Sequence, residues 1–382
     1  MTLSSDLSNQ KCICDKYEFE LIFETSTGEK IYRCHDSIVV KLPENRNALT
    51  TSWINGGYRE NIDAVFNHQL KEPGENNPDG LEGLSVQDYM NVTAKRLGLN
   101  PENVSGLITS AEMKHVAISS KRFRNIEVTA VVTGGINVNG GRAGDPASYY
   151  EENGKFELKL GTINTIILIN SKLQESTLLK AMIVAVEAKT VALQQLIAPS
   201  KYSTGIATGS GTDGISVISN MESETVLTNA GKHSKLGELI GTCVIEATSQ
   251  ALANQTNLTP DSQRDMLIRL NRFSIDEEKY WETASSLPGT KQKRKFIDNL
   301  HDFSKNPQVV SIVSSILHIV DEVEWGLIPE TSGKTAAISI MKTLPDILKI
   351  EELSEADELL DENDSITENW IKLSSWYIKN MS

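Results

Sequence analysis

The chain has 382 residues and a formal net charge of −14 at pH 7, with 51 Asp and Glu against 37 Lys and Arg. This balance argues against a protein that binds nucleic acid by neutralising phosphates, although a local basic patch could persist. No run reaches the ~18 apolar residues that a membrane helix needs, and residues 1–10 lack the apolar segment of a secretory signal. We therefore expect no nucleic-acid partner and no membrane insertion.

Four cysteines in a chain of this length do not form a disulfide framework, so a reducing, cytoplasmic location is the simplest interpretation. Cys12, Cys14 and the Cys34-His35 pair offer metal-binding atoms. However, Cys-x-Cys is not the usual zinc spacing, and no second pair follows it. We expect plain thiols on or near a strand, without a protein metal site.

The N-terminal part of the chain is typical of β-structure. Residues 17–23 are followed by a turn at 27–30 and a second apolar segment at 31–34, which predicts a hairpin. The next expected elements are a strand at 38–42, a loop at 71–79, and a helix at 85–97 with Ser85 as its N-cap.

The middle of the chain alternates between strands and helices. Two β-branched runs, 126–133 and 161–170, predict strands buried on both faces. Residues 176–197 then predict a helix that ends before Pro199, because apolar and Thr side chains recur every three or four positions. These positions are Leu179, Met182, Ile183, Val186 and Thr190. A glycine-rich turn region at 202–214, a strand at 215–219 and a helix at 236–253 follow.

The sequence changes character near residue 258, where glycine becomes rarer and helical patterns become longer. Helices are expected at 262–273, 291–303 and 309–323, and an acidic run at 351–368 precedes one apolar helix face at 370–377. We therefore predict an α/β fold, or a mixed α+β one, whose β-sheet core is covered by helices. Its domains are 1–257 and a mostly helical extension of unknown role, 258–382.

Two segments match nucleotide-binding motifs in residue type, but not in the structural context that these motifs require. Residues 209–214 fit G-x-G-x-x-G, but a strand follows where the dinucleotide fingerprint requires a helix. The Gly333-Lys334-Thr335 tripeptide resembles the end of a P-loop, yet the required earlier glycine is Ile328. Both matches are interpreted as chance.

The segment 134–145 combines four chemistries: glycines that allow close approach, amides, a guanidinium and a carboxylate. It could bind a ligand or could be a long turn in which Arg142 and Asp145 pair. In the following helix, Glu187 and Lys189 point to opposite sides, and Glu187 is either paired structurally or directed into a site. His233, just before a helix, could do acid–base work, but a loop histidine is more often simply exposed.

Seven stretches, in this order, resemble the adenosylcobinamide amidohydrolase family, the CbiZ-type enzymes of corrinoid salvage. Together they span roughly residues 40–255, and the ordered set is specific although each stretch alone is weak. The stretches are residues 55–57, 106–111, 128–135, 142–147, 161–165, 187–190 and 202–214. The extension after residue 258 does not match the family core.

The resemblance implies an enzyme that hydrolyses the amide between the corrin propionate and aminopropanol of adenosylcobinamide. Its products would be adenosylcobyric acid and 1-aminopropan-2-ol, which feed cobalamin salvage. Cobalt would arrive within the substrate, so the protein would require no cofactor. A non-catalytic corrinoid-binding protein and, less favoured, a nucleotide-dependent kinase or transferase are the alternatives, and a homo-oligomer stays open.

Amide hydrolysis needs an activated nucleophile, donors for the oxyanion and an acid for the leaving amine. The catalytic candidates are Asp213, Glu187, Asp145, Lys189 and His233, with Asp213 preferred as the base that activates water because it lies in the densest glycine loop. Thr208, Ser210 and Thr212 are also candidate nucleophiles. The substrate-binding candidates are Asn55, Gly134, Gly135, Asn137, Arg142, Asn164, Thr165, Ser203, Thr208, Ser210 and Thr212.

Overall fold

The computed structural model describes residues 18–70, 85–147, 150, 161–288, 292–349 and 357–380. The chain forms two compact units, and the first ends at Leu258 while the second begins at Thr259 and also includes Ser203–Gly205. Cys12, Cys14, the predicted loop at 71–79 and part of the acidic run lie outside the described residues.

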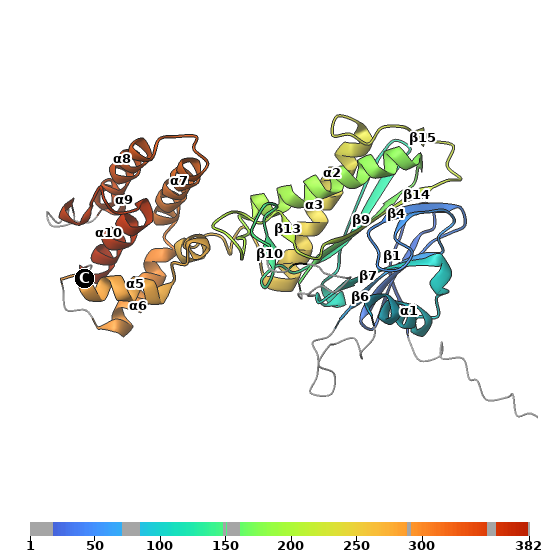
Figure 1. The fold of residues 1–382 in the computed structure, drawn as a ribbon, viewed down its shortest axis with the longest axis horizontal. Helices are drawn as coiled ribbons and strands as arrows, with labels where there is room; N and C mark the ends of the chain where they lie inside the picture. The colour runs from blue at the N-terminus through green and yellow to red at the C-terminus, as the bar shows by residue number, and fades with distance from the viewer. Residues whose placement is uncertain are drawn as a thin grey trace, which may run out of the picture. The chain divides into compact units, whose positions relative to one another are not determined.

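The first unit is built on two β-sheets, which Figure 1 shows on the blue-to-green half of the colour scale. The five-stranded sheet has the order β1 (Glu20–Glu24), β2 (Lys30–Cys34), β3 (Ser37–Lys41), β6 (Ala64–Gln69) and β7 (Val104–Thr109). The six-stranded sheet has the order β5 (Gly57–Arg59), β4 (Arg46–Thr50), β14 (Gly214–Asn220), β11 (Ile163–Ile169), β9 (Ile126–Gly134) and β8 (Ala117–Phe123). The predicted hairpin is confirmed, because β1 pairs with β2 antiparallel.

Both sheets are mixed, and helices cover their outer faces. Within the larger sheet, β11 pairs parallel with β14 and antiparallel with β9. Helices α2 (Glu175–Gln195) and α3 (Lys235–Thr256) pack on one face of the larger sheet, and its other face packs against the smaller sheet. Helix α1 (Val86–Arg96), capped by Ser85 as predicted, covers the far face of the smaller sheet. The predicted sheet core covered by helices is confirmed as a mixed α+β fold.

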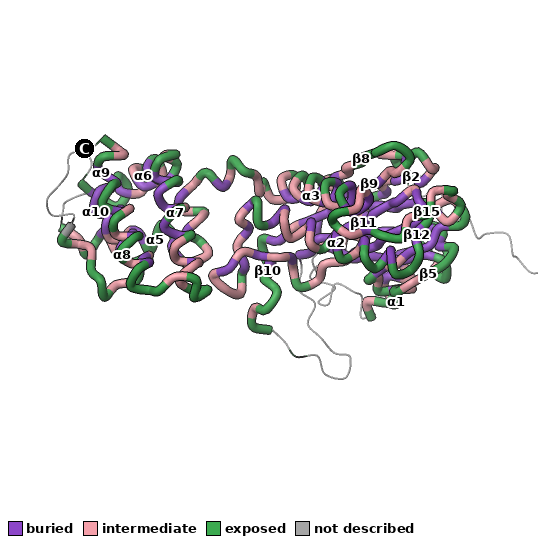
Figure 2. Tube along the Cα trace, turned by 90° about the horizontal axis from the view of Figure 1, so that it is seen from above, coloured by how far each residue is buried: buried purple, intermediate pink, exposed green. Residues whose placement is uncertain are grey.

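Helix α2 forms where predicted, but the apolar stripe that predicted it faces outward. Leu179, Ile183 and Val186 are 53%, 47% and 44% exposed. The buried face is rich in alanine, whose small side chain allows close packing against the sheet and α3. Because α2 is apolar on nearly all sides, periodicity alone could not tell its inner face from its outer one. Figure 2 shows the buried residues concentrated between the layers.

The second unit is helical, as predicted, and its core surrounds α10 (Ile366–Asn380), where Trp370, Trp376 and Tyr377 are buried. Its other helices are α4 (Met266–Leu270), α5 (Glu277–Ser286), α6 (Lys293–Ser304), α7 (Pro307–Glu324), α8 (Glu330–Met341) and α9 (Leu344–Leu348). The helix predicted at 262–273 is shorter, with only five α-helical residues in α4 followed by a 3₁₀ turn.

Helix α8 explains the Gly333-Lys334-Thr335 sequence without a nucleotide. The tripeptide lies inside the helix, and a Cβ at Gly333 would collide with the Val323 side chain of α7. The glycine therefore allows α7 and α8 to pack closely. In the part of the chain that the structure describes, no helix combines the length and the apolar character needed to cross a membrane.

Candidate active site

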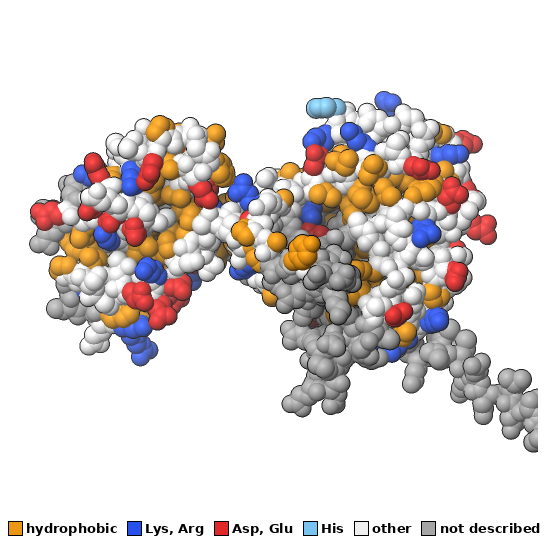
Figure 3. Space-filling view, viewed as in Figure 1, with side chains coloured by type: hydrophobic (Ala, Val, Ile, Leu, Met, Phe, Trp, Pro, Cys, Tyr) orange, Lys and Arg blue, Asp and Glu red, His pale blue; other side chains and the backbone are white. Residues whose placement is uncertain are grey.

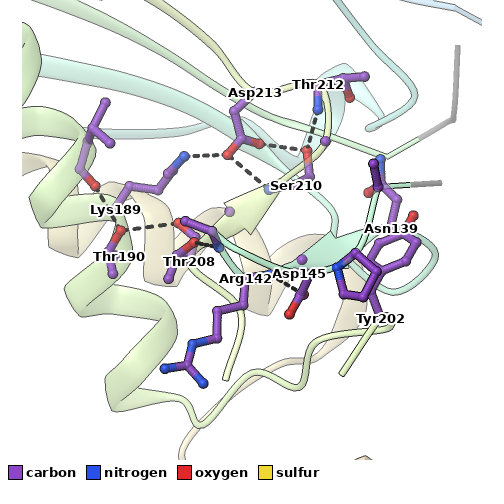
Figure 4. A pocket seen from close by; sticks show the side chains of 17 residues that line it. Asn139, Arg142, Asp145, Lys189, Thr190, Tyr202, Thr208, Ser210, Thr212 and Asp213 are labelled. Atoms are coloured by element: carbon purple, nitrogen blue, oxygen red, sulfur yellow. Dashed lines mark hydrogen bonds and ion pairs between the residues drawn. The ribbon is translucent and has the colours of Figure 1, made fainter. Parts of the chain in front are cut away.

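A pocket of about 690 Å³ opens in the first unit beside the C-terminal half of α2. Its walls come from α2, from the segment around β10 (Gly140–Gly141), and from the loop that contains β13 (Gly209–Ser210) and leads into β14. Pairing of β10 with β13 joins segments about 70 residues apart, and Thr208 adds a hydrogen bond from its N–H to the Gly141 carbonyl. Figure 4 shows polar side chains from all three walls.

The carboxylate of Asp213, at the wall of this pocket, receives four contacts from described residues. Its Oδ1 accepts hydrogen bonds from the Ile163 N–H at 2.9 Å and the Ser210 hydroxyl at 2.7 Å. Its Oδ2 accepts from the Ser210 N–H at 3.0 Å and forms an ion pair with Nζ of Lys189. The side chains of Lys189 and Asp213 are only 12% and 16% exposed, so water screens this pair weakly.

Gly209 makes room for this pair. A Cβ at this position would collide with Oδ2 of Asp213 and lie 2.7 Å from Nζ of Lys189. A Cβ at Gly211, two residues later, would have no atom within 4 Å. The two glycines of one loop therefore differ: Gly209 is required by packing, whereas Gly211 is not.

Thr190, which follows Lys189 in α2, links the helix to the loop through hydrogen bonds. Its hydroxyl lies 3.1 Å from the carbonyls of both Val186 and Thr208. The Thr208 hydroxyl in turn accepts from the Ala143 N–H at 2.9 Å. Thr212 donates to the Gly161 carbonyl at 2.8 Å. These bonds fix the loop that carries Ser210 and Asp213.

Arg142 and Asp145 lie on the wall that faces this loop, but their contact is not the simple salt bridge considered from the sequence. Oδ2 of Asp145 accepts from the backbone N–H of Arg142 at 2.7 Å and from the Ser200 hydroxyl at 2.6 Å. Asp145 thus holds the turn, whereas the Arg142 side chain is exposed at the pocket. Figure 4 shows its guanidinium directed away from Asp213.

Two of the catalytic candidates lie outside the pocket. Glu187 forms a half-exposed ion pair with Lys232 at 2.8 Å, which matches the structural alternative considered for it. His233 is exposed on the loop before α3, whose N-cap is Ser234. The pocket therefore contains Asp213, Lys189 and Asp145, but neither Glu187 nor His233.

Several of the predicted substrate-binding residues lie outside the pocket, and two of them hydrogen-bond within the fold. Asn55 adopts φ 50° and donates to the carbonyls of Pro101 and Val104. Asn164 is buried between the two sheets and donates to Asn67 at 2.7 Å. The remaining candidates outside the pocket lining are Thr165 in the interior of β11, Gly134, Gly135, the exposed Asn137, and Ser203.

Of the substrate-binding candidates, Arg142, Thr208, Ser210 and Thr212 do line the pocket. Three further polar residues line the pocket and were not predicted from the sequence: Asn139, Thr190 and Tyr202. Thr190 had a signal, because it shares a helix face with Val186. Asn139 and Tyr202 are brought to the pocket by the pairing of β10 with β13, which local sequence patterns do not predict.

The two cysteines in the described residues, Cys34 and Cys243, are both buried. Burial raises the pKa of the Cys243 thiol to about 11 and also raises that of Cys34, so both stay protonated at neutral pH. Within the described residues, no three His, Cys, Asp or Glu side chains gather as a metal site would require.

Comparisons with known proteins identify the family of the first unit. Residues 22–260, more than half of the chain, match the model of the adenosylcobinamide amidohydrolase family, CbiZ. The uncharacterised protein MJ1613 of Methanocaldococcus jannaschii is 30% identical over 234 residues, which cover 58% of this chain and 88% of that protein. The adenosylcobinamide amidohydrolase of Methanosarcina mazei is 28% identical over 140 residues, 37% of this chain and 56% of that enzyme.

Two solved structures show a weaker likeness. The PH0078 protein from Pyrococcus horikoshii OT3 is 11% identical, and the match covers 62% of this chain and 80% of that one. A Burkholderia sp. beta-aminopeptidase is 9% identical, with 64% and 85% covered, and both matches have a TM-score of 0.30. That level of likeness implies nothing about activity. On its sequence, over residues 22–260, this chain belongs to the adenosylcobinamide amidohydrolase family.

Proposed function

We propose that the chain hydrolyses adenosylcobinamide at the amide between the corrin propionate and aminopropanol, and that the chemistry takes place in the pocket at Asp213. The observation that carries this proposal is a partly buried Lys189–Asp213 pair in contact with a serine hydroxyl, inside a pocket and within the family region. Adenosylcobyric acid and 1-aminopropan-2-ol would be the products. Cobalt belongs to the substrate.

The contacts of Asp213 favour Ser210 over water as the group that it activates. A carboxylate has about four lone-pair directions, and four hydrogen bonds already use them. A water molecule could reach Asp213 only by displacing a present donor. The Ser210 hydroxyl already donates to Oδ1, so its proton has an acceptor in place when the oxygen attacks.

The reaction then has two balanced stages. The Ser210 oxygen bonds to the amide carbon while its proton moves to Asp213, and the C–N bond breaks as Lys189 gives a proton to the leaving amine. Lys189 regains a proton from Asp213. Water then cleaves the Ser210 ester, which restores the hydroxyl and releases the carboxylic acid.

The oxyanion needs donors in the same pocket. An ammonium group has three N–H donors, and in the described part of the structure Lys189 uses one of them, on Asp213. The N–H of Gly211, which also lines the pocket, has no acceptor among the described residues. Both groups are available to the developing negative charge.

The test is to incubate the purified protein with adenosylcobinamide, without nucleotide or added metal, and to analyse the corrinoid by mass spectrometry. We expect the mass of adenosylcobyric acid together with free 1-aminopropan-2-ol. Acid-quenched protein should carry the corrinoid acyl group on Ser210. Unchanged corrinoid that co-elutes with the protein would contradict hydrolysis and favour a corrinoid-binding protein, and a strict need for ATP or GTP would favour a transferase.

A further inference from the structure

An apolar stripe lies on the outer face of α2, formed by Leu179, Ile183 and Val186. These side chains are about half exposed and follow one another at four- and three-residue spacing, so they lie on one side of the helix. Figure 3 shows hydrophobic side chains gathered over this part of the first unit. A soluble helix normally directs polar residues outward, so an outward apolar stripe calls for a ligand or partner.

The stripe is continuous with the pocket. Val186 and, one turn further along, Thr190 belong both to the outer face of α2 and to the pocket lining. From Leu179 to Val186 the stripe is about 10 Å long, because a helix rises 1.5 Å per residue. A ligand in the pocket that is too large to enter it completely would therefore rest on this stripe.

We propose that the α2 stripe binds the apolar face of the macrocycle that carries the scissile amide. This inference rests on the proposed function, which supplies a ligand with a reactive arm on a much larger ring system. The arm would occupy the pocket near Ser210, and the ring would lie along Val186 and Ile183. Affinity for the substrate would come largely from the ring, and the chemistry from the arm.

A second protein is a poorer occupant. Three half-exposed aliphatic side chains provide only a small part of the ~800 Å² per partner that a standard protein interface buries. The same area suffices for one face of a rigid small molecule, whose binding sites are mostly apolar with few polar groups.

The experiment measures binding of the reaction product, adenosylcobyric acid, which retains the macrocycle and lacks the aminopropanol. Equilibrium dialysis followed by corrinoid absorbance would compare the wild-type protein with Ile183→Asn and Ile183→Leu. We expect Ile183→Asn to weaken binding about tenfold or more, because it places an amide against the apolar ring. Ile183→Leu should bind within about twofold of wild type. Val226→Asn, which changes another exposed apolar residue of the same unit outside the stripe, should have no effect.

The outcomes separate this inference from the proposed function. If Ile183→Asn and wild type bound adenosylcobyric acid equally well, the inference would be overturned. Hydrolysis of adenosylcobinamide by the same samples would still support the proposed function. Absence of hydrolysis by wild type would reject the function, and the dialysis would still report whether the stripe binds the ring. A wild-type dimer in sedimentation that Ile183→Asn converts to a monomer would assign the stripe to a second copy of the chain and reject the inference.

Discussion

Two largely buried charge pairs of the first unit, Arg46–Glu29 and Lys189–Asp213, lie in different surroundings. Arg46 and Glu29 are 2% and 4% exposed, and the guanidinium also donates to the carbonyls of Glu44 and Thr27. Thr25 and Thr27 complete the contacts of Glu29. This pair joins the turn after β1 to the start of β4 and lies outside the lining of the pocket beside α2.

The Asp213 carboxylate of the other pair accepts four contacts from described residues, against three on Glu29, and its pair opens onto the pocket. The Ser210 hydroxyl donates to Asp213, and the Lys189 ammonium has donors that no acceptor among the described residues uses. Both groups face the pocket, where a ligand could exchange protons with them. A guanidinium group, in contrast, stays protonated in proteins and does not act as an acid near neutral pH. The enclosed Arg46–Glu29 pair therefore links parts of the fold, whereas the Lys189–Asp213 pair at the cavity wall is the one that we propose for chemistry.

The largest expected effect is on turnover, at the carboxylate of the pocket pair. Asp213→Asn removes the proton acceptor of Ser210 and should reduce adenosylcobinamide hydrolysis at least about a thousandfold. It also leaves Lys189 partly buried without its counter-ion, so thermal unfolding must be measured alongside. Near-normal turnover of a folded Asp213→Asn protein would remove this residue from the mechanism.

The two glycines of the loop provide a matched pair of variants. Gly209→Ala places a methyl group against Asp213 and Lys189, so we expect a loss of turnover of about a hundredfold or more. Gly211→Ala meets open space and should retain activity within a few-fold. Steady-state rates of both variants measure the difference, and equal rates would show that the pair geometry does not control the chemistry.

The buried Arg46–Glu29 pair should contribute to the free energy of unfolding and to its dependence on pH. Burial raises the pKa of Glu29, but hydrogen bonds from Thr25, Thr27 and Arg46 outweigh it, so the net pKa lies below the ordinary 4.5. Its stabilising contribution is therefore complete above the ordinary pKa and is lost as the pH falls through the folded value. Glu29→Gln should cost about 3–5 kcal/mol at neutral pH, because the buried Arg46 guanidinium keeps only a distant carboxylate, the exposed Glu222 at 3.7 Å.

Denaturant unfolding at several pH values between about 7 and 3 measures this contribution. The stability gap between wild type and Glu29→Gln should be constant at neutral pH and narrow below about pH 4.5. A gap that stays constant through the acid range would show that the charge of Glu29 does not contribute.

The smallest effect is expected at the exposed pair of Glu187 with Lys232. Both side chains are more than 40% exposed and lie outside the pocket lining, and such pairs contribute about 0–1 kcal/mol. Glu187→Gln should therefore change turnover less than about threefold, as measured by release of 1-aminopropan-2-ol. A large loss would return Glu187 to the catalytic candidates.

Local patterns were enough to predict the hairpin, the strands at β9 and β11, and helices α2, α3 and α10, because each carries its own periodicity. They did not predict α5 or α8. The first of these is dominated by charged and small side chains, and the second contains Gly333, which helix propensities disfavour. The orientation of α2 could not be predicted either, because its inner face is rich in alanine and its outer face carries larger apolar side chains.

Within the site, Asp213, Ser210 and Thr212 could be grouped because they share one glycine-rich loop. Lys189 was a candidate, but its contact with Asp213 depends on how α2 lies over β14. Asn164 carries the same chemistry as a binding residue, yet it faces the space between the sheets and hydrogen-bonds Asn67. Which face of a strand turns inward depends on the partner sheet, and that information is not local.

The most direct test of the whole account is the rate of adenosylcobinamide hydrolysis by Ser210→Ala. Alanine keeps the backbone N–H that donates to Asp213 and removes only the hydroxyl, so the Lys189–Asp213 pair and the fold should survive. We predict normal thermal unfolding and a loss of turnover of at least about a thousandfold, with no acyl group trapped on the protein. Turnover close to that of wild type would contradict a serine nucleophile and return the role to an activated water.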